Sequence, residues 1–290
     1  MAEGARDVRD ERAETPSGEL VYRIRGGEGA VPVVYLPGVH GDWTPQAAAS
    51  VILAGAFRLV EISYPREPLW RLEDYASALV SLLDRLEIES AHVVAESFGS
   101  LVGWEFGLEH GSRVRSMVIV GGFCQPPGPR KVLLAKWGLS VLPTGLFEQG
   151  VDAYVAIRKH RGKLEHPEME VDLPYATVRT DLGRIATVSR FEIMCTSDYR
   201  HQLHEVLFPV RYIGGDSDLI VPVKREIRTL SELLSEEAGF QSRLIANAPH
   251  MIISSHPVET AGQIADWIME VDGREGTSGD QHPPGEPVGA

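Results

Sequence analysis

Residues 91–111 read AHVVAESFGSLVGWEFGLEHG and decide the fold of this chain. The first part is a short apolar run rich in valine, which is typical of a buried strand. A helical pattern follows without a spacer, so Ser97 lies in a sharp turn between a strand and a helix. Ala95 and Gly99 flank the serine, and small residues are required there because the two backbones approach closely. Such a turn directs the serine hydroxyl away from the sheet.

Ser97 has two interpretations, one chemical and one structural. At the amino end of a helix, backbone N–H groups favour negative charge, as a reacting serine needs. The alternative is a serine that only caps the helix. The pentapeptide alone does not decide, but its place between a strand and a helix favours the chemical role. Glu96, beside the serine, is a candidate for a buried, perturbed carboxylate, but we expect it to face the loop around residues 38–43 or solvent.

The rest of the chain alternates strand and helix patterns. An alternating run at 18–27 predicts an antiparallel edge strand. Short apolar runs that predict buried parallel strands cover residues 31–37, 57–65, 91–97, 115–122, 208–215 and 240–248. Helical patterns cover residues 72–88, 98–111, 222–239 and 257–271. This order predicts an α/β fold with a mostly parallel sheet and right-handed crossovers.

One long segment interrupts this alternation. Residues 123–205 contain no strand pattern and indicate several short helices separated by prolines. A connection of about 80 residues is far longer than a usual crossover, so we predict an inserted subdomain. The core then comprises residues 18–122 and 206–270. The ends, residues 1–17 and 271–290, carry too few apolar side chains to offset their conformational entropy and are predicted to be disordered.

Composition excludes several classes of protein. A formal net charge of −13 argues against a general nucleic-acid binder, which needs a basic face. No run approaches the roughly 18 apolar residues of a membrane span, and the first residues lack the apolar segment of a secretory signal. Cys124 and Cys195 cannot form a disulfide framework, which favours two reduced thiols and a cytoplasmic location. Nothing in the sequence indicates the oligomeric state.

A nucleophilic serine needs a base, and the chain has ten histidines. His250 follows the last predicted strand and precedes the last helix. Parallel strands place their carboxyl ends at one edge, so His250 is expected beside Ser97. His256 is the rival, although its position before Pro257 at a helix start favours a capping or surface role.

The base in turn needs a carboxylate that orients it and stabilises its charged form. The loop after the strand at 208–215 contains two candidates, Asp216 and Asp218. Aspartates in such loops are often simple turn formers. Either residue gives the chain order serine, aspartate, histidine.

These motifs resemble those of the α/β-hydrolase superfamily over roughly residues 20–270. The family shares this chain order, and its pattern G-x-x-D-x-[IL]-V-P matches GDSDLIVP at 215–222 and selects Asp218. The family histidine follows two small residues, as His250 follows Ala248 and Pro249. Ala95 departs from the usual first glycine of G-x-S-x-G. The resemblance implies an α/β-hydrolase fold with a mostly parallel central sheet flanked by helices.

The resemblance also implies an oxyanion hole and an inserted helical cap over 123–205 that roofs the substrate pocket. The N–H groups of Val39 and Phe98 are the expected oxyanion donors, and His40-Gly41 offers a second register. Pocket candidates, each of which either lines the pocket or packs inside the cap or a glycine turn, are Gly38, His40, Trp137, Leu142, Phe147 and Tyr154.

The expected activity is that of a serine hydrolase that cleaves a small-molecule carboxylic ester or related acyl bond through Ser97, His250 and Asp218. Two alternatives stay open. One is an acyltransferase or perhydrolase that uses the same three residues, and the other is a non-catalytic small-molecule-binding member of the fold. The sequence has no CxxC, HExxH or P-loop motif, so we expect no metal and no cofactor.

Overall fold

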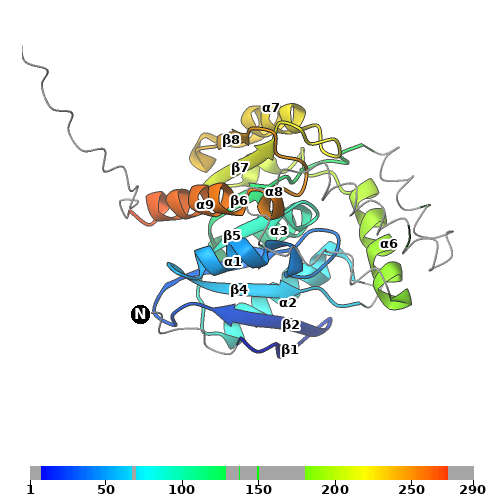
Figure 1. Cartoon of the computed structure of the whole chain (residues 1–290), viewed down its shortest axis with the longest axis vertical. Coiled ribbons are helices and arrows are strands. Elements are labelled where there is room, and N and C mark those ends of the chain that lie inside the picture. The colour runs from blue at the N-terminus through cyan, green and yellow to red at the C-terminus, as the bar shows by residue number, and fades with distance from the viewer. Residues whose placement is uncertain (1–7, 67–69, 129–136, 138–148, 150–179, 274–290) are drawn as a thin grey trace, which may run out of the picture.

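The computed structural model describes residues 8–66, 70–128, 137, 149 and 180–273. Eight strands form one sheet in the order β1-β2-β4-β3-β5-β6-β7-β8 (Figure 1). β1 and β2 run antiparallel to their neighbours, and the remaining pairs are parallel. The strands are β1 (Glu11–Thr15), β2 (Gly18–Arg25), β3 (Val31–Leu36), β4 (Phe57–Ser63), β5 (Ala91–Glu96), β6 (Val114–Val120), β7 (Val210–Gly215) and β8 (Gln241–Ile245).

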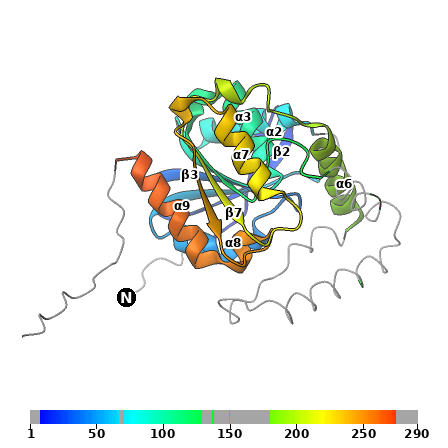
Figure 2. The ribbon, with the colours of Figure 1, turned by 90° about the horizontal axis from the view of Figure 1, so that it is seen from above.

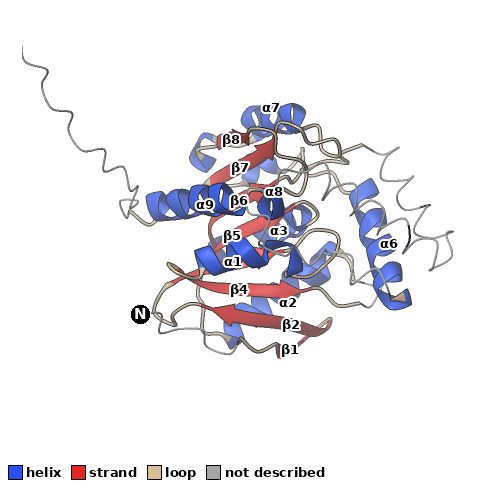
Figure 3. Ribbon diagram, in the orientation of Figure 1, coloured by secondary structure: helices blue, strands red, loops and turns tan. Residues whose placement is uncertain are grey.

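Helices cover both faces of this sheet (Figures 2 and 3). One face packs against α2 (Leu72–Arg85), α3 (Gly99–Glu109) and α7 (Val223–Leu233). The other face packs against α1 (Ala47–Leu53), α8 (Ile252–Ser255) and α9 (Pro257–Val271). Short 3₁₀ helices lie at Thr44–Gln46, Gly111–Arg113, Leu203–Glu205 and Glu236–Ala238.

The pleat of the strands divides their side chains between two apolar cores. On β5, Val93 and Ala95 belong to the core beneath α2 and α3, and Val94 belongs to the core beneath α1 and α9. Because both faces are covered, the central strands are buried along most of their length and are rich in valine and other apolar residues. Each fully buried valine or leucine contributes roughly 1.5–3 kcal/mol relative to an exposed one. This accumulated burial holds the sheet that carries the candidate site at its carboxyl edge.

The predicted fold class is confirmed: the chain has an α/β-hydrolase fold with a mostly parallel sheet. All seven predicted strand runs overlap strands, and the four predicted helices are present. The sequence patterns did not indicate α1 or α8. Both are short, with seven and four residues, so each offers too few turns for a clear helical period.

The prediction of a disordered tail over residues 1–17 is wrong for β1. This strand pairs with β2, from Glu11 opposite Tyr22 to Thr15 opposite Gly18. Ala13 is its one buried apolar side chain, so the alternation that marks a strand is nearly absent from the sequence. Pairing with β2 supplies the stability that the apolar pattern lacks. Residues 1–7 and 274–290 lie outside the described part of the chain.

The described part of the predicted cap includes one long helix. α6 (Asp181–Thr196) belongs to the segment between β6 and β7. Its Arg190 donates hydrogen bonds to the carbonyl oxygens of Val39 and Pro65, which follow β3 and β4. α6 therefore lies at the carboxyl edge of the sheet. Most of residues 123–205 lies outside the described residues, so the boundaries of the cap stay a prediction.

Candidate active site

Ser97 lies in a tight turn between β5 and α3. Its φ is 48°, in the left-handed region that costs a non-glycine residue roughly 1–2 kcal/mol. The Ser97 N–H donates to the carbonyl of Val120 at 3.0 Å, which ties the turn to β6. On the opposite side, a Cβ on Gly99 would lie 2.3 Å from the carbonyl oxygen of Leu36, so only glycine fits. The neighbouring strands thus hold the serine in a strained conformation at the carboxyl edge.

The three residues predicted as a triad lie together at this edge. Ser97 Oγ is 2.9 Å from His250 Nε2, and His250 Nδ1 is 2.8 Å from Asp218 Oδ2. An ionised carboxylate only accepts hydrogen bonds, so Nδ1 carries the proton in this pair. Nε2 is then the acceptor for the serine hydroxyl, which is the tautomer that a general base requires.

Asp218 is held in place by its own loop. Its side chain is fully buried, and its Oδ1 accepts from the N–H groups of Ile220 at 2.7 Å and Val221 at 3.0 Å. Burial acts to raise the pKa of Asp218. The hydrogen bond and charge of His250, with the two backbone donors, outweigh this effect, and the pKa lies below its usual value. The carboxylate is therefore ionised and fixed at neutral pH.

The alternative candidates for the acid and the base, Asp216 and His256, lie in other positions. Asp216 is exposed in the same loop and accepts a hydrogen bond from Ser217 Oγ. His256 lies at the start of α9, with its Nδ1 2.9 Å from Ser255 Oγ. Across the described residues, His250 is the side chain in hydrogen-bond contact with the Ser97 hydroxyl.

Val39 and Phe98, the expected oxyanion donors, come from the two segments that adjoin Ser97. The N–H of Gly41 donates to the carbonyl of Gly38 at 2.9 Å and closes a four-residue turn. This turn lies against the serine, because a Cβ on Gly38 would be 3.5 Å from Ser97 Cβ. Within the described ranges the N–H groups of Val39 and Phe98 have no protein acceptor. A substrate oxygen placed between them would satisfy both.

His40 and Glu96 lie buried next to this turn. His40 Nε2 is 3.0 Å from the carbonyl oxygen of Asp42, and burial lowers the pKa of His40 against the opposing charges of Glu96 and Asp42. Glu96 is 2% exposed and accepts a hydrogen bond from the Tyr35 hydroxyl at 2.5 Å. The expectation that Glu96 faces solvent is wrong, because the β5 pleat turns it toward Tyr35 on β3. Its alternative, the loop at 38–43, agrees with the charge interaction with His40.

The structure describes only some of the residues predicted to line the substrate pocket. Gly38 and His40 adjoin the serine turn, as described above. Trp137 is 60% exposed, and its place in a pocket stays a prediction because the residues on both sides of it lie outside the described part of the chain. Leu142, Phe147 and Tyr154 lie outside the described residues. No group of three or more potential metal ligands gathers among the residues that the structure describes.

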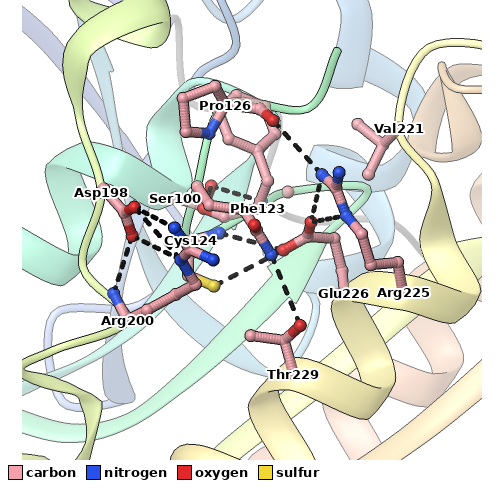
Figure 4. Close-up of polar contacts among 12 residues, drawn as sticks. Ser100, Phe123, Cys124, Pro126, Asp198, Arg200, Val221, Arg225, Glu226 and Thr229 are labelled. Atoms are coloured by element: carbon pink, nitrogen blue, oxygen red, sulfur yellow. Dashed lines mark hydrogen bonds and ion pairs between the residues drawn. The ribbon is translucent and has the colours of Figure 1, made fainter.

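Sequence reasoning missed a cluster of polar contacts around the buried Glu226 (Figure 4). Glu226 on α7 is fully buried, and its carboxylate accepts from the backbone N–H of Cys124 at 3.3 Å and from the Cys124 thiol at 3.5 Å. Arg225 donates to the same carboxylate at 2.9 Å and to the carbonyl of Pro126. The Tyr199 N–H donates to the Cys124 carbonyl at 2.8 Å. The cluster thereby joins both ends of the predicted cap to α7.

Burial and the nearby charge of Glu226 raise the pKa of the Cys124 thiol, so it stays protonated at neutral pH. Its contacts give Cys124 a structural role. No sequence signal pointed to this cluster. A glutamate on an amphipathic helix ordinarily faces water, and only the fold reveals its buried partners.

Comparison with known proteins identifies related sequences and similar folds. Residues 48–140 match the family described as alpha/beta hydrolase fold. The "Putative carbamate hydrolase RutD" of Azorhizobium caulinodans is 28% identical over 240 residues, which cover 75% of this chain and 82% of that protein. The pimeloyl-[acyl-carrier protein] methyl ester esterase of Methylococcus capsulatus is 26% identical over 229 residues, covering 74% and 86%. The crystal structure of the enol-lactonase from Burkholderia xenovorans LB400 superposes with a TM-score of 0.73 at 19% identity, covering 89% and 100%.

The chain has the α/β-hydrolase fold, and the family model and the relatives that it matches are α/β hydrolases. It is a hydrolase of the α/β fold, as its relatives are. None of the helices in the described ranges has the length and apolar character of a transmembrane segment.

Proposed function

We propose that the protein is a serine hydrolase that cleaves a small-molecule carboxylic ester or related acyl bond. The observation that carries the proposal is the continuous hydrogen-bond chain from Ser97 through His250 to Asp218. A serine hydroxyl is a weak nucleophile by itself, and an adjacent base that is oriented by a carboxylate activates it.

In the first half of the reaction, Ser97 Oγ bonds to the substrate carbonyl carbon while its proton passes to His250 Nε2. The buried carboxylate of Asp218 stabilises the resulting imidazolium. The carbonyl π electrons move to the oxygen, which becomes an oxyanion held by the N–H groups of Val39 and Phe98. The intermediate then collapses, and the departing alkoxide takes the proton from His250. An acyl group remains on Ser97.

In the second half, His250 removes a proton from water as the water oxygen bonds to the acyl carbon. The second intermediate releases Ser97, which regains its proton from His250, and a carboxylic acid leaves. Each well-placed oxyanion donor contributes about 100- to 1,000-fold to the rate. An alcohol, thiol or peroxide in place of water would give acyl transfer, which is the alternative outcome of the same intermediate.

The class of substrate draws support from the names of relatives. One is named for carbamate hydrolysis and another for hydrolysis of a methyl ester. Both reactions attack a carbonyl that carries a leaving group, which is the chemistry that the geometry at Ser97 supports. A solved neighbour is named an esterase, although at 18% identity it supports the fold alone.

A fluorophosphonate probe tests the proposal. It should label the wild-type protein and fail to label Ser97→Ala, and the variant should lose hydrolysis of p-nitrophenyl acetate. Ser254→Ala is a matched control, because the Ser254 hydroxyl only donates to the carbonyl of Pro45. Equal labelling of wild type and Ser97→Ala would contradict the proposal. Turnover of a panel of acyl esters of increasing chain length would then define the pocket.

A further inference from the structure

Arg190 on α6 is a buried cation that the proposed mechanism does not use. Its side chain is almost fully buried, with 1% of the residue exposed. Nη1 donates to the carbonyl oxygen of Val39 at 3.0 Å, and Nη2 donates to that of Pro65 at 2.9 Å. The guanidinium also lies over the ring of Tyr64, 5.5 Å from its centroid. One side chain thereby connects α6 to the loops after β3 and β4.

Burial of the Arg190 guanidinium carries a large desolvation cost. Its Nε has no hydrogen-bond partner, and no carboxylate pairs with it in the described part of the chain. Burial of a cation without a counter-ion costs several kcal/mol in desolvation, and carbonyl oxygens and an aromatic face repay only part of it. A neutral side chain would fill this space with a smaller desolvation cost. The buried cation therefore indicates a role beyond packing.

The first carbonyl that Arg190 holds belongs to the turn at residues 38–41. Because peptide bonds are trans, the Val39 N–H points opposite to the Gly38 carbonyl. That carbonyl accepts from the Gly41 N–H inside the turn, so the Val39 N–H points out of it. Arg190 fixes the next peptide through the Val39 carbonyl. The two hydrogen bonds set both peptide planes beside Val39 and therefore the direction of its N–H.

Two further contacts hold the turn at residues 38–41 in place. Gly41 lies directly against the guanidinium, since a Cβ there would be 2.5 Å from Arg190 Nη1. The Gly41 carbonyl accepts from the Tyr64 N–H at 2.8 Å. The Tyr64 ring packs edge-on against Phe98, with centroids 5.9 Å apart. Arg190 and Tyr64 thus contact both residues whose N–H groups would hold the oxyanion.

We propose that Arg190 is a positioning residue: it sets the direction of the Val39 N–H through the Val39 carbonyl and so shapes the oxyanion hole. This inference rests on the proposed function. It also links α6, on the segment between β6 and β7, to the reaction at Ser97. Arg190 does not touch the reacting atoms in this account.

Arg190→Lys tests the proposal, because lysine keeps the charge and stem but cannot donate to both carbonyls in a fixed fork. We expect kcat for p-nitrophenyl acetate to fall about 10- to 100-fold, as a displaced catalytic donor does, while KM changes less than about twofold. An aryl trifluoromethyl ketone, whose carbonyl carbon bonds Ser97 Oγ to leave an oxyanion, should bind more weakly by a similar factor. Binding of the product, acetate, should not change.

Arg211→Lys is the matched control. Arg211 is also buried, donates to the backbone carbonyls of Val210 and Gly239, and has an unpartnered Nε, although it differs from Arg190 in a further contact with Glu270 at 3.4 Å. It lies at the amino end of β7, away from Ser97. Its replacement by lysine should leave kcat and inhibitor binding unchanged, although the melting temperature falls. Equal losses in both variants, or an unchanged kcat in folded Arg190→Lys, would overturn the proposal.

A second variant, Arg190→Met, keeps an apolar stem and removes every donor. It should lose at least as much kcat as Arg190→Lys, with circular dichroism like that of wild type. If neither variant folds, Arg190 serves the fold alone and the proposal is overturned. Failure of the proposed function is a different result: wild-type activity in Ser97→Ala would contradict that function, whatever the Arg190 variants do.

Discussion

The described residues contain two serine–histidine–aspartate chains, at opposite edges of one sheet. At the carboxyl edge, His250 bridges Ser97 and Asp218, at 2.9 and 2.8 Å. At the amino edge, His92 Nδ1 is 2.7 Å from Ser116 Oγ, and His92 Nε2 is 3.0 Å from Asp272 Oδ1. Distances alone do not separate the two.

Their surroundings do separate them. Ser97 has a left-handed backbone and lies in the turn before α3, whereas Ser116 lies within strand β6 and His92 is fully buried. The ring nitrogens are also exchanged, because Asp272 meets Nε2 where Asp218 meets Nδ1. In the described sheet, β6 lies between β5 and β7, so paired strands rather than an open turn flank Ser116. The comparison teaches that access, strain and oxyanion donors, rather than the hydrogen-bond chain, distinguish a reactive serine from a structural one.

The largest expected effect separates the two histidines. His250→Ala should lower kcat/KM for p-nitrophenyl acetate by about 10⁴- to 10⁶-fold, as loss of a base from such a chain does. His92→Ala should keep kcat/KM within about twofold per folded molecule and lower the melting temperature, since Ser116 and Asp272 lose their partner. A large activity loss in folded His92→Ala would break the distinction.

The two aspartates of the loop after β7 give a second test of the distinction between the catalytic and the structural chain. Asp218→Asn should lower kcat by about 10⁴-fold, because an amide at this position favours the wrong imidazole tautomer. Asp216→Asn, two residues earlier in the same loop, is the matched control and should stay within about twofold. Steady-state kinetics on both variants give the answer, and similar losses in both would mean that the acid is wrongly assigned.

The turn that distinguishes Ser97 from Ser116 has its own test. Gly99→Ala places a Cβ 2.3 Å from the Leu36 carbonyl oxygen and should destabilise the fold by about 2–4 kcal/mol. Gly262→Ala in α9 meets no atom within 4 Å and should stabilise it by about 0.5–1 kcal/mol. Urea unfolding measures both. A Gly99→Ala protein as stable as wild type would show that the turn is not tight.

The smallest effect concerns pH at the amino edge. Burial lowers the pKa of His92, against the hydrogen bond and charge of Asp272. The folded state therefore disfavours the charged ring, and the unfolded state binds the proton first as pH falls below about 6.5. Stability should be highest above that pH and decrease as pH falls toward the folded-state pKa. Unfolding free energies from pH 8 to 5 should decrease less in His92→Gln than in wild type or in the exposed-site variant His204→Gln.

The sequence predicted the strands and the three residues at Ser97 for the same reason. Buried parallel strands have local apolar runs, and residues just after such runs share one edge, which placed His250 and the loop with Asp216 and Asp218 near Ser97. The resemblance to the α/β-hydrolase pattern then selected Asp218. β1 was missed because only Ala13 on it is buried. β1 is ordered by its pairing with β2. Pairing with another strand leaves no recognisable pattern within the five residues of β1 itself.

Arg190 and Glu226 were out of reach for a different reason. Arg190 binds backbone carbonyls, which every residue has, so no partner type marks it. Glu226 meets Cys124, 102 positions away, across the segment between β6 and β7. Charged residues on helices ordinarily face water, and only the packed structure identifies these two as buried.

Peptide-resolved mass spectrometry after reaction with a fluorophosphonate tests the central claim most directly, since all serines of the native protein compete at once. The account predicts one adduct, on the peptide that contains Ser97, and an unmodified peptide around Ser116. Absence of any adduct, or an adduct on Ser116 with Ser97 unmodified, would contradict it.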